Sequence, residues 1–313
     1  MLVVLALAGG FLWSLRSDHE PEVVAGPTEL VGGAIPVRAN VTRAAGAPIA
    51  DGFTVAEGSV LVGYPLPLLY SEMSGAKRED DGWTTLLLVT ESARGVLDRY
   101  LRQADALGFP VWGPSCRTDR GVLACAAGAR EGFSYRDGYD HGRSLTFDLL
   151  QGRGTKNHPP LSSIRITYHR VGDPPYPEAE RVDMTPEPDD AFMPTEWPAL
   201  PEVGEEFWSD RPFTVVPGTI LLAHPTAVGG VGSGTTSLFE VTGDPEEVLE
   251  AFWEQRPKTH GGLPRDERHE DTRSRNGVTI RSIEWTDGQG QSFRIWEQKD
   301  HPAILLVQTS PSD

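Results

Sequence analysis

The pattern of apolar positions along the chain predicts the same succession of elements twice. Residues 84–90 (TTLLLVT) and 237–242 (SLFEVT) are short apolar runs typical of buried strands. Each run is followed by a stretch in which apolar residues recur at helical spacing. The two stripes are Val96, Leu97, Tyr100, Leu101, Ala104 and Leu107 in the first stretch, and Val248, Leu249, Phe252 and Trp253 in the second. We therefore expect one amphipathic helix after each strand.

The residues at the ends of these stretches indicate where the helices begin and end. Ser92 and Asp244 stand at the capping positions, where a side-chain oxygen accepts hydrogen bonds from the first free backbone N–H groups. Pro245 suits the first helical position of the second stretch. Gly108 is a natural stop signal for the first helix because glycine readily adopts the left-handed conformation.

The segments that precede the two strands are similar to each other. Residues 53–65 (FTVAEGSVLVGYP) and 213–225 (FTVVPGTILLAHP) lie 160 positions apart and share 6 of 13 residues. A second block follows at an offset of 152, where Val89, Thr90, Val96, Leu97 and Gln103 match Val241, Thr242, Val248, Leu249 and Gln255. Two blocks in the same order, with matching element types, indicate an internal repeat.

Both copies return to strands after the helix. The predicted strands cover residues 121–127, 144–150 and 163–169 in the first copy and 277–285, 291–296 and 302–308 in the second. The fold class that follows is α+β, a tandem duplication of a strand-strand-helix-strand-strand-strand unit. We expect each unit to form an antiparallel sheet with one helix packed on one face.

The remaining stretches divide the chain around the two units, which we place at residues 49–171 and 213–313. Residues 172–212 are rich in proline and acidic residues and form the predicted linker. Residues 1–15 (MLVVLALAGGFLWSL) are uncharged but short for a membrane span. We therefore interpret residues 1–16 as a signal anchor or the remnant of one transmembrane segment, followed by a stalk at 17–48. A buried N-terminal helix is the alternative.

Charge and cysteine content narrow the possible partners and the compartment. The formal net charge of −17 repels phosphate backbones, so we expect no nucleic-acid partner, and contact with the membrane only through the N-terminal segment. Cys116 and Cys125 are close enough in sequence to join in a disulfide, which would fit an oxidising compartment. Two reduced cysteines on neighbouring strands remain the alternative.

The loop at 131–143 (EGFSYRDGYDHGR) carries the candidate binding residues Tyr135, Asp137, Tyr139, Asp140 and His141. Exposed tyrosines are favoured at interfaces, and carboxylates with an imidazole suit a metal ion. However, the spacing matches no known calcium or zinc pattern, and a plain hairpin tip is the simpler interpretation. We predict no metal site and no cofactor.

Other polar segments give weaker signals for chemistry. Residues 259–275 contain two histidines and several carboxylates, but dense mixed charge is typical of a solvated face. Ser233 lies in a glycine-rich run, but its spacing differs from the Gly-x-Ser-x-Gly nucleophile turn. No catalytic residue is predicted on these grounds.

The sequence shows no convincing catalytic pattern, and its N-terminal segment indicates placement at a membrane. We therefore favour a noncatalytic, membrane-anchored extracytoplasmic protein of the bacterial cell envelope that binds a ligand or assembles with a protein partner. We expect the paired sheets to form a groove between the units. Two alternatives stay open: an extracytoplasmic hydrolase with a dispersed His/carboxylate site, and a membrane-tethered sensor or regulator. The sequence identifies neither the ligand nor the partner.

Overall fold

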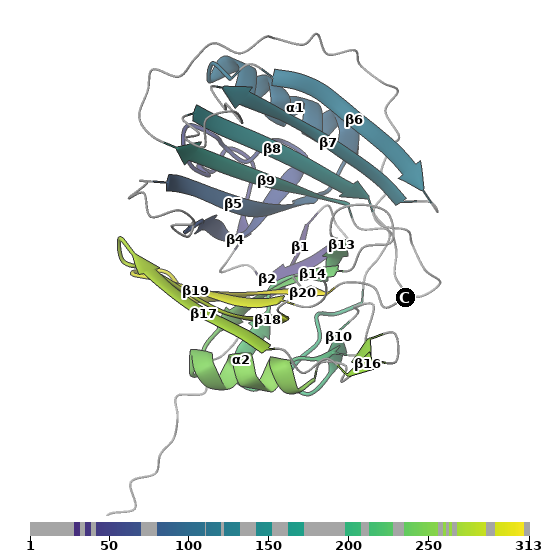
Figure 1. Cartoon of the computed structure of the whole chain (residues 1–313). Coiled ribbons are helices and arrows are strands. Elements are labelled where there is room, and N and C mark those ends of the chain that lie inside the picture. The colour runs from purple at the N-terminus through teal and green to yellow at the C-terminus, as the bar shows by residue number, and fades with distance from the viewer. Residues whose placement is uncertain are drawn as a thin grey trace, which may run out of the picture.

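The protein consists of two antiparallel sheets, each covered by one long helix (Figure 1). The computed structural model describes residues 28–31, 35–38, 42–69, 80–109, 111–119, 122–131, 142–151, 162–171, 198–207, 213–227, 235–255, 259–260, 263–264, 268–285 and 292–309. Among these residues, no helix is long and apolar enough to cross a membrane. The predicted anchor at 1–16 lies outside the described residues.

The first sheet is built from residues 42–171. Its elements are β3 (Thr42–Arg43), β4 (Ser59–Pro67), β5 (Asp80–Val89), α1 (Ala93–Ala106), β6 (Val111–Asp119), β7 (Val122–Glu131), β8 (Gly142–Gln151) and β9 (Ser162–Val171). The strands lie in the order β3-β4-β5-β9-β8-β7-β6. The last strand, β9, thus lies beside β5, and the strand that follows the helix forms an edge.

The second sheet is built from residues 219–309. Its elements are β12 (Thr219–Leu221), β13 (Thr226–Ala227), β14 (Thr235–Val241), α2 (Pro245–Glu254), β17 (Arg268–Arg275), β18 (Val278–Trp285), β19 (Ser292–Gln298) and β20 (Ala303–Thr309). The order is β12-β14-β20-β19-β18-β17, with β13 also paired to β14. Three short hairpins complete the described strands: β1 (Thr28–Val31) with β2 (Ile35–Arg38), β10 (Glu206–Phe207) with β11 (Phe213–Thr214), and β15 (Thr259–His260) with β16 (Leu263–Pro264).

The α+β class is confirmed, but in each of the two large sheets four described strands follow the helix where we predicted three. The additional strands, β6 and β17, form edges of the two sheets, and each is the first strand of its sheet to follow the helix. In β6 the register shifts between Trp112 and Ser115, where the sequence holds a Gly-Pro pair. β17 reads RHEDTRSR and has no apolar residue. Edge strands tolerate proline and charge, so these two lacked the apolar pattern on which the prediction depended.

Both helices begin where the sequence predicted. The Ser92 side chain accepts a hydrogen bond from the N–H of Gly95, and Asp244 accepts from Glu246 and Glu247. The predicted apolar stripes face the sheets, with Tyr100 and Phe252 fully buried. Gly108, which follows α1, has a φ of 80°, the left-handed conformation expected at a helix end.

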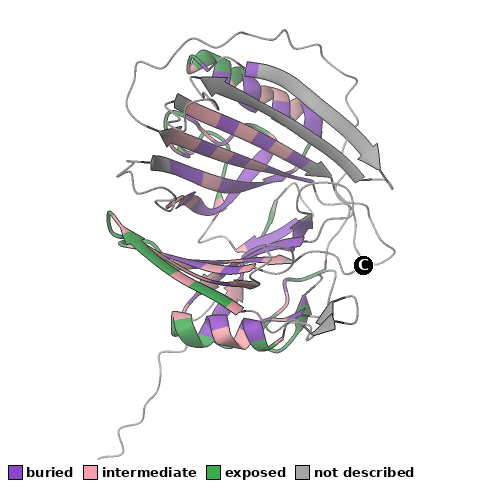
Figure 2. Cartoon of the chain, viewed as in Figure 1, coloured by how far each residue is buried: buried purple, intermediate pink, exposed green. Residues whose placement is uncertain are grey.

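The two units stack as four layers, helix-sheet-sheet-helix (Figure 1). One core lies between α1 and the first sheet, and includes Leu87, Tyr100 and Phe147. A second lies between α2 and the second sheet, and includes Phe239 and Phe252. A third core joins the facing surfaces of the two sheets. Figure 2 shows the buried residues continuing through all of these layers.

Two stretches outside the predicted units also contribute to these cores. Ile35 and Val37, in the predicted stalk, are buried in the core between the sheets. The backbone N–H of Arg38 donates to the carbonyl oxygen of Leu222 at 3.0 Å. Leu200 and Phe207, in the predicted linker, are buried beside α2 and the second sheet. Residues 35–38 of the predicted stalk and the described part of the linker therefore pack on the second unit, whereas β3, also in the predicted stalk, pairs with β4 of the first sheet.

Candidate functional site

A cavity of about 280 Å³ lies between the two sheets. Both units line it. Alternate residues of a strand point to opposite faces of a sheet, so each sheet presents one set of side chains to its helix and the other set to the cavity. In β5, Leu87 faces α1 whereas Leu86 faces the second sheet. In β14, Phe239 faces α2 whereas Leu238 faces the first sheet. The apolar part of the wall is formed mainly by Val62, Leu66, Leu86, Leu238, Ile304 and Leu306.

Two arginines from opposite units also line this cavity. Arg165 comes from β9 of the first sheet, and Arg294 from β19 of the second. The described residues that line the cavity include no aspartate or glutamate. The wall therefore combines apolar surface with two guanidinium groups, which are strong hydrogen-bond donors without acceptor capacity.

Arg165 is held across the boundary between the units. Its Nη2 donates a 3.1 Å hydrogen bond to Thr236 Oγ1 of β14. Burial lowers the pKa of Arg165, the carboxylate of Asp148 raises it, and the positive charge of Arg294 lowers it. The positive charge of Arg294 thus acts on Arg165 from the opposite sheet.

Asp148 lies beside Arg165 on the neighbouring strand β8, where the two residues are paired in register. Burial raises the pKa of Asp148, and the attraction of Arg165 opposes that rise. The carboxylate thus offsets part of the charge of Arg165 from outside the described cavity wall.

Arg294 has a carboxylate partner of its own. Its Nη2 lies 2.9 Å from Oε2 of Glu284 on β18, and the Arg294 side chain is 41% exposed. An ion pair with this much exposure contributes little free energy, because water screens both charges. The N–H groups of Arg294 can therefore leave Glu284 and bind a ligand at a low cost in free energy.

Hydrogen bonds between the units close the cavity on the side of β4. The hydroxyl of Tyr64 donates to the carbonyl oxygen of Pro302 at 2.9 Å. The indole N–H of Trp296 donates to the carbonyl oxygen of Pro67 at 2.8 Å. Burial raises the pKa of Tyr64 to about 12, so this phenol remains a donor throughout the physiological range. These two hydrogen bonds thus help to fix the distance between the two sheets.

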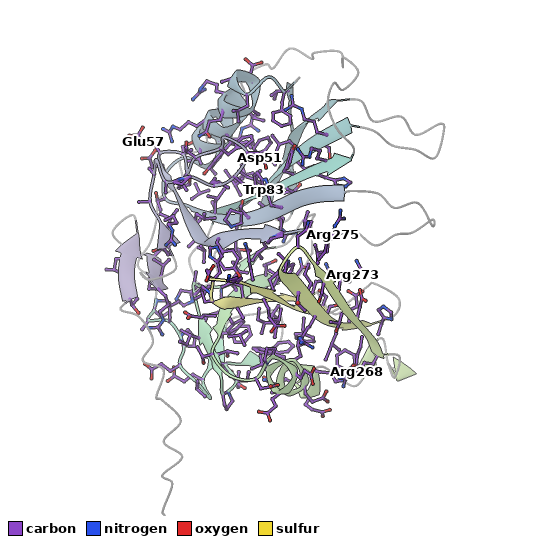
Figure 3. All side chains as sticks on the ribbon, turned by 90° about the vertical axis from the view of Figure 1, so that its left-hand side faces the viewer. Asp51, Glu57, Trp83, Arg268, Arg273 and Arg275 are labelled. Atoms are coloured by element: carbon purple, nitrogen blue, oxygen red, sulfur yellow. The ribbon has the colours of Figure 1, made fainter. Side chains whose placement is uncertain are left out.

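The edge strand β17 contributes one more hydrogen bond between the units. Nη1 of Arg273 donates to the carbonyl oxygen of Leu69 at 3.2 Å. Figure 3 shows Arg273 and Arg275 near the end of the second sheet that approaches the first, with Arg268 farther away beside α2. Arg268 pairs there with Glu250 of α2 at 2.7 Å.

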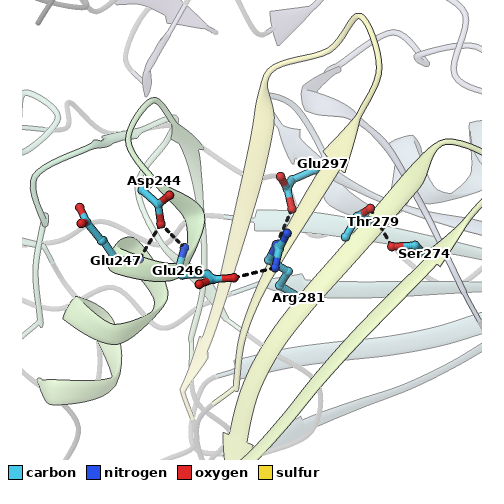
Figure 4. Close-up of polar contacts among 7 residues, drawn as sticks. All are labelled: Asp244, Glu246, Glu247, Ser274, Thr279, Arg281 and Glu297. Atoms are coloured by element: carbon cyan, nitrogen blue, oxygen red, sulfur yellow. Dashed lines mark hydrogen bonds and ion pairs between the residues drawn. The ribbon is translucent and has the colours of Figure 1, made fainter.

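A second hollow, of about 440 Å³, lies on the outer face between α2 and strands β17 and β18. It is lined by Glu246, Glu247, Glu250, Glu270 and Asp271 together with Arg268 and Arg281. Arg281 bonds Glu246 of α2 at 2.9 Å and Glu297 of β19 at 2.7 Å (Figure 4). These contacts hold the start of α2 on its sheet, which is a structural role.

The predicted binding residues Tyr135, Asp137, Tyr139, Asp140 and His141 lie outside the described residues, as does Ser233. In the charged segment at 259–275, His269 and Glu270 are exposed on β17. Within the described part of the chain, no group of three or more His, Cys, Asp or Glu side chains converges as a metal site would require.

Cys116 and Cys125 are directly opposed in register on β6 and β7. Opposed residues of an antiparallel pair have Cα atoms about 4.5–5.5 Å apart, within the range that a disulfide spans. The backbone is therefore compatible with the predicted disulfide, which stays a prediction.

Comparison with protein-family models, with curated protein sequences and with solved structures finds no match.

The sequence prediction did not identify Arg165 or Arg294. Each is a single arginine within a strand of alternating apolar residues, SIRIT and SFRIW. An arginine on the second face of a strand is usually solvated, so this signal alone could not single out either residue. What gives them a role is the second sheet that covers that face.

Proposed function

We propose that this protein is a noncatalytic binding protein in which two copies of one structural unit enclose a small molecule. The observation that carries the proposal is the cavity of about 280 Å³ between the sheets, with walls drawn from both units. Small-molecule sites are typically concave, largely apolar and equipped with a few polar groups, and they often lie between domains.

A tandem duplication is supported by strand order. Strand by strand, β4-β5-β9-β8-β7-β6 corresponds to β12-β14-β20-β19-β18-β17, and a helix follows the second strand of each set. Identical placement of six strands and one helix is difficult to obtain from two unrelated units. The offsets of 160 and 152 residues from the sequence alignment connect the same elements.

Matching hydrogen bonds support the same proposal. The N–H of Thr54 donates to Oε1 of Gln103 at 3.0 Å, and the N–H of Thr214 donates to Oε1 of Gln255 at 2.7 Å. The N–H of Thr90, just after β5, donates to the carbonyl oxygen of Gly58, just before β4, at 2.8 Å. In the second unit the N–H of Thr242, just after β14, donates to the carbonyl oxygen of Gly218, just before β12, at the same distance.

The two copies differ in charge along a matched row of residues that includes both cavity arginines. Register places Leu86, Arg165 and Asp148 in one row across the first sheet. The matching row of the second sheet is Leu238, Leu306 and Arg294. Arg165 thus corresponds to a leucine, and Asp148 to an arginine. The shared fold does not require charged residues at these positions, since the other copy has different ones. This difference supports a role for Arg165 and Arg294 in binding a ligand and not in folding.

The binding test compares the full chain with a variant in which the cavity is filled. Leu306→Phe adds bulk to the wall, and Val203→Phe adds the same ring type at a site that is 53% exposed. We expect some members of a panel of anionic, neutral and cationic small molecules to raise the melting temperature of wild type and Val203→Phe but not of Leu306→Phe. Absence of any such compound would contradict the proposal, and conversion of a bound compound, seen by mass spectrometry, would favour the hydrolase alternative.

We further propose that the protein acts outside the cytoplasm, anchored to the membrane through residues 1–16. The uncharged apolar run at 1–15 and the opposed cysteines in β6 and β7 support this placement. Deleting residues 1–16 should move the protein from the membrane fraction to a soluble fraction of the producing cell. Retention in the membrane fraction after that deletion would contradict the anchor.

A further inference from the structure

We infer that the cavity between the sheets takes an amphipathic anion, a carboxylate or phosphate ester attached to a compact apolar body. This inference rests on the proposed binding function and specifies its ligand class. It follows from three features of the cavity: the charge of its wall, the donor groups left on that wall, and its size.

The charge of the wall has the sign that an anion requires. Arg165 and Arg294 line the cavity from opposite sheets, whereas the carboxylates that offset part of their charge, Asp148 and Glu284, are not among the described lining residues. This is a local reversal, because the chain as a whole has a formal net charge of −17. A negative long-range field does not attract anions, so their binding would have to come from these two side chains.

The donors of both arginines are incompletely used. Among the described residues, Arg165 has one hydrogen bond, to Thr236, although a guanidinium carries five N–H donors. Arg294 is paired with Glu284 in a contact that water already screens. Carboxylate and phosphate oxygens match the planar fork of arginine and accept two parallel hydrogen bonds from it.

The apolar lining and the volume describe the rest of the ligand. Leu66, Leu86, Trp296, Ile304 and Leu306 present hydrocarbon and aromatic surface to the cavity. The volume of about 280 Å³ corresponds to about nine water molecules at roughly 30 Å³ each. A chain of about eight carbons with one anionic headgroup has a comparable number of heavy atoms.

The experiment uses calorimetric titration of the full chain with octanoate, octyl phosphate, 1-octanol and octyltrimethylammonium. We expect either anion to bind at least about tenfold more tightly than the alcohol or the cation, as charge-assisted hydrogen bonds require. Arg165→Gln and Arg294→Gln should each weaken anion binding about tenfold and leave binding of the alcohol unchanged. Arg294→Lys should retain part of the affinity because it keeps the charge without the fork.

Arg281→Gln is the matched control, since Arg281 lies on the opposite face of the same sheet and bonds Glu246 and Glu297. It should leave the affinity for the anions unchanged. Circular dichroism of each variant separates loss of binding from loss of folding.

Two results would overturn the ligand class. One is binding of octanol or the ammonium as tight as that of the anions, and the other is anion binding that Arg165→Gln and Arg294→Gln do not affect. In either case the cavity could still bind other compounds of the panel, so the proposed function would stand. If no compound of any class discriminates between wild type and Leu306→Phe, the proposed function itself fails.

Discussion

The indole N–H of Trp296 in the second sheet donates a 2.8 Å hydrogen bond to the carbonyl oxygen of Pro67 in the first sheet. Trp296 is 3% exposed, so water cannot readily replace this bond. We expect Trp296→Phe to lower the free energy of unfolding by roughly 1–3 kcal/mol, because it leaves the carbonyl without this donor. Urea denaturation measures this change, and a variant as stable as wild type would show that the bond does not hold the sheets together.

The two matched glutamines, Gln103 in the last turn of α1 and Gln255 directly after α2, give a paired prediction. Gln103 accepts one backbone hydrogen bond, from Thr54, whereas Gln255 accepts from both N–H and Oγ1 of Thr214 and donates to its carbonyl oxygen. Replacing either glutamine with leucine should destabilise the protein, with the larger loss at Gln255, on the order of 2 kcal/mol. Chemical denaturation of both variants under the same conditions tests the order. A larger loss at Gln103 would contradict the prediction.

The glycines at the matched turns should differ in their tolerance of alanine. Gly58 and Gly218 have φ values of 77° and 78°, where a Cβ atom is strained. A Cβ on Gly218 would meet the backbone Cα of Gly243 at 3.0 Å, whereas on Gly58 it would meet the flexible side chain of Glu91. We expect Gly58→Ala to cost about 1–2 kcal/mol and Gly218→Ala more, as measured by thermal denaturation. Equal costs would show that the Gly243 backbone moves freely.

Asp148 should make stability depend on pH. Its pKa is raised in the folded state by burial, so the folded protein binds this proton more tightly than the unfolded chain. The stabilisation is therefore complete below the usual aspartate pKa of about 3.9 and is lost as the pH rises through the raised folded value. Asp148→Asn should match wild type at low pH and be the more stable protein above that window.

The measurement for Asp148 is the free energy of unfolding of both proteins across the acidic range. Glu254→Gln, at an exposed position of α2, serves as the control for loss of a surface carboxylate. An Asp148→Asn curve parallel to that of wild type would contradict the prediction.

Mass spectrometry of protein exported by the producing cell should find Cys116 joined to Cys125. The two residues are directly opposed in register, at a separation that a disulfide can span. The disulfide closes a short loop and should stabilise the protein by about 2–3 kcal/mol relative to the reduced form. Recovery of both thiols in unmodified, free form would contradict the pairing.

The sequence predicted the helices and their first strands well because these elements carry local signals. Ser92 and Asp244 cap the helices, and the stripes that include Tyr100 and Phe252 are buried as the spacing indicated. The edge strands β6 and β17 have no such signal: one contains Gly-Pro and the other only polar residues. Exposure at a sheet edge removes the selection for apolar alternation that strand prediction needs.

The candidate site was beyond sequence reasoning for a different reason. The repeat identified two units, but it did not specify which face of each sheet would meet the other. Leu86 and Leu238 suggest apolar inner faces, whereas Arg165 and Arg294 on the same faces suggest exposure to water. Only the packing of sheet on sheet brings these four side chains to one cavity.

The third core has a consequence for how the protein unfolds. Leu88, Leu222 and Ile304 are fully buried only because the other sheet covers them, so a separated unit would expose an extensive apolar face to water. The free-energy cost of exposing this apolar face disfavours any state in which one unit is folded and the other is not. Although the chain repeats its architecture, its two halves should melt in a single cooperative transition, as one thermodynamic domain.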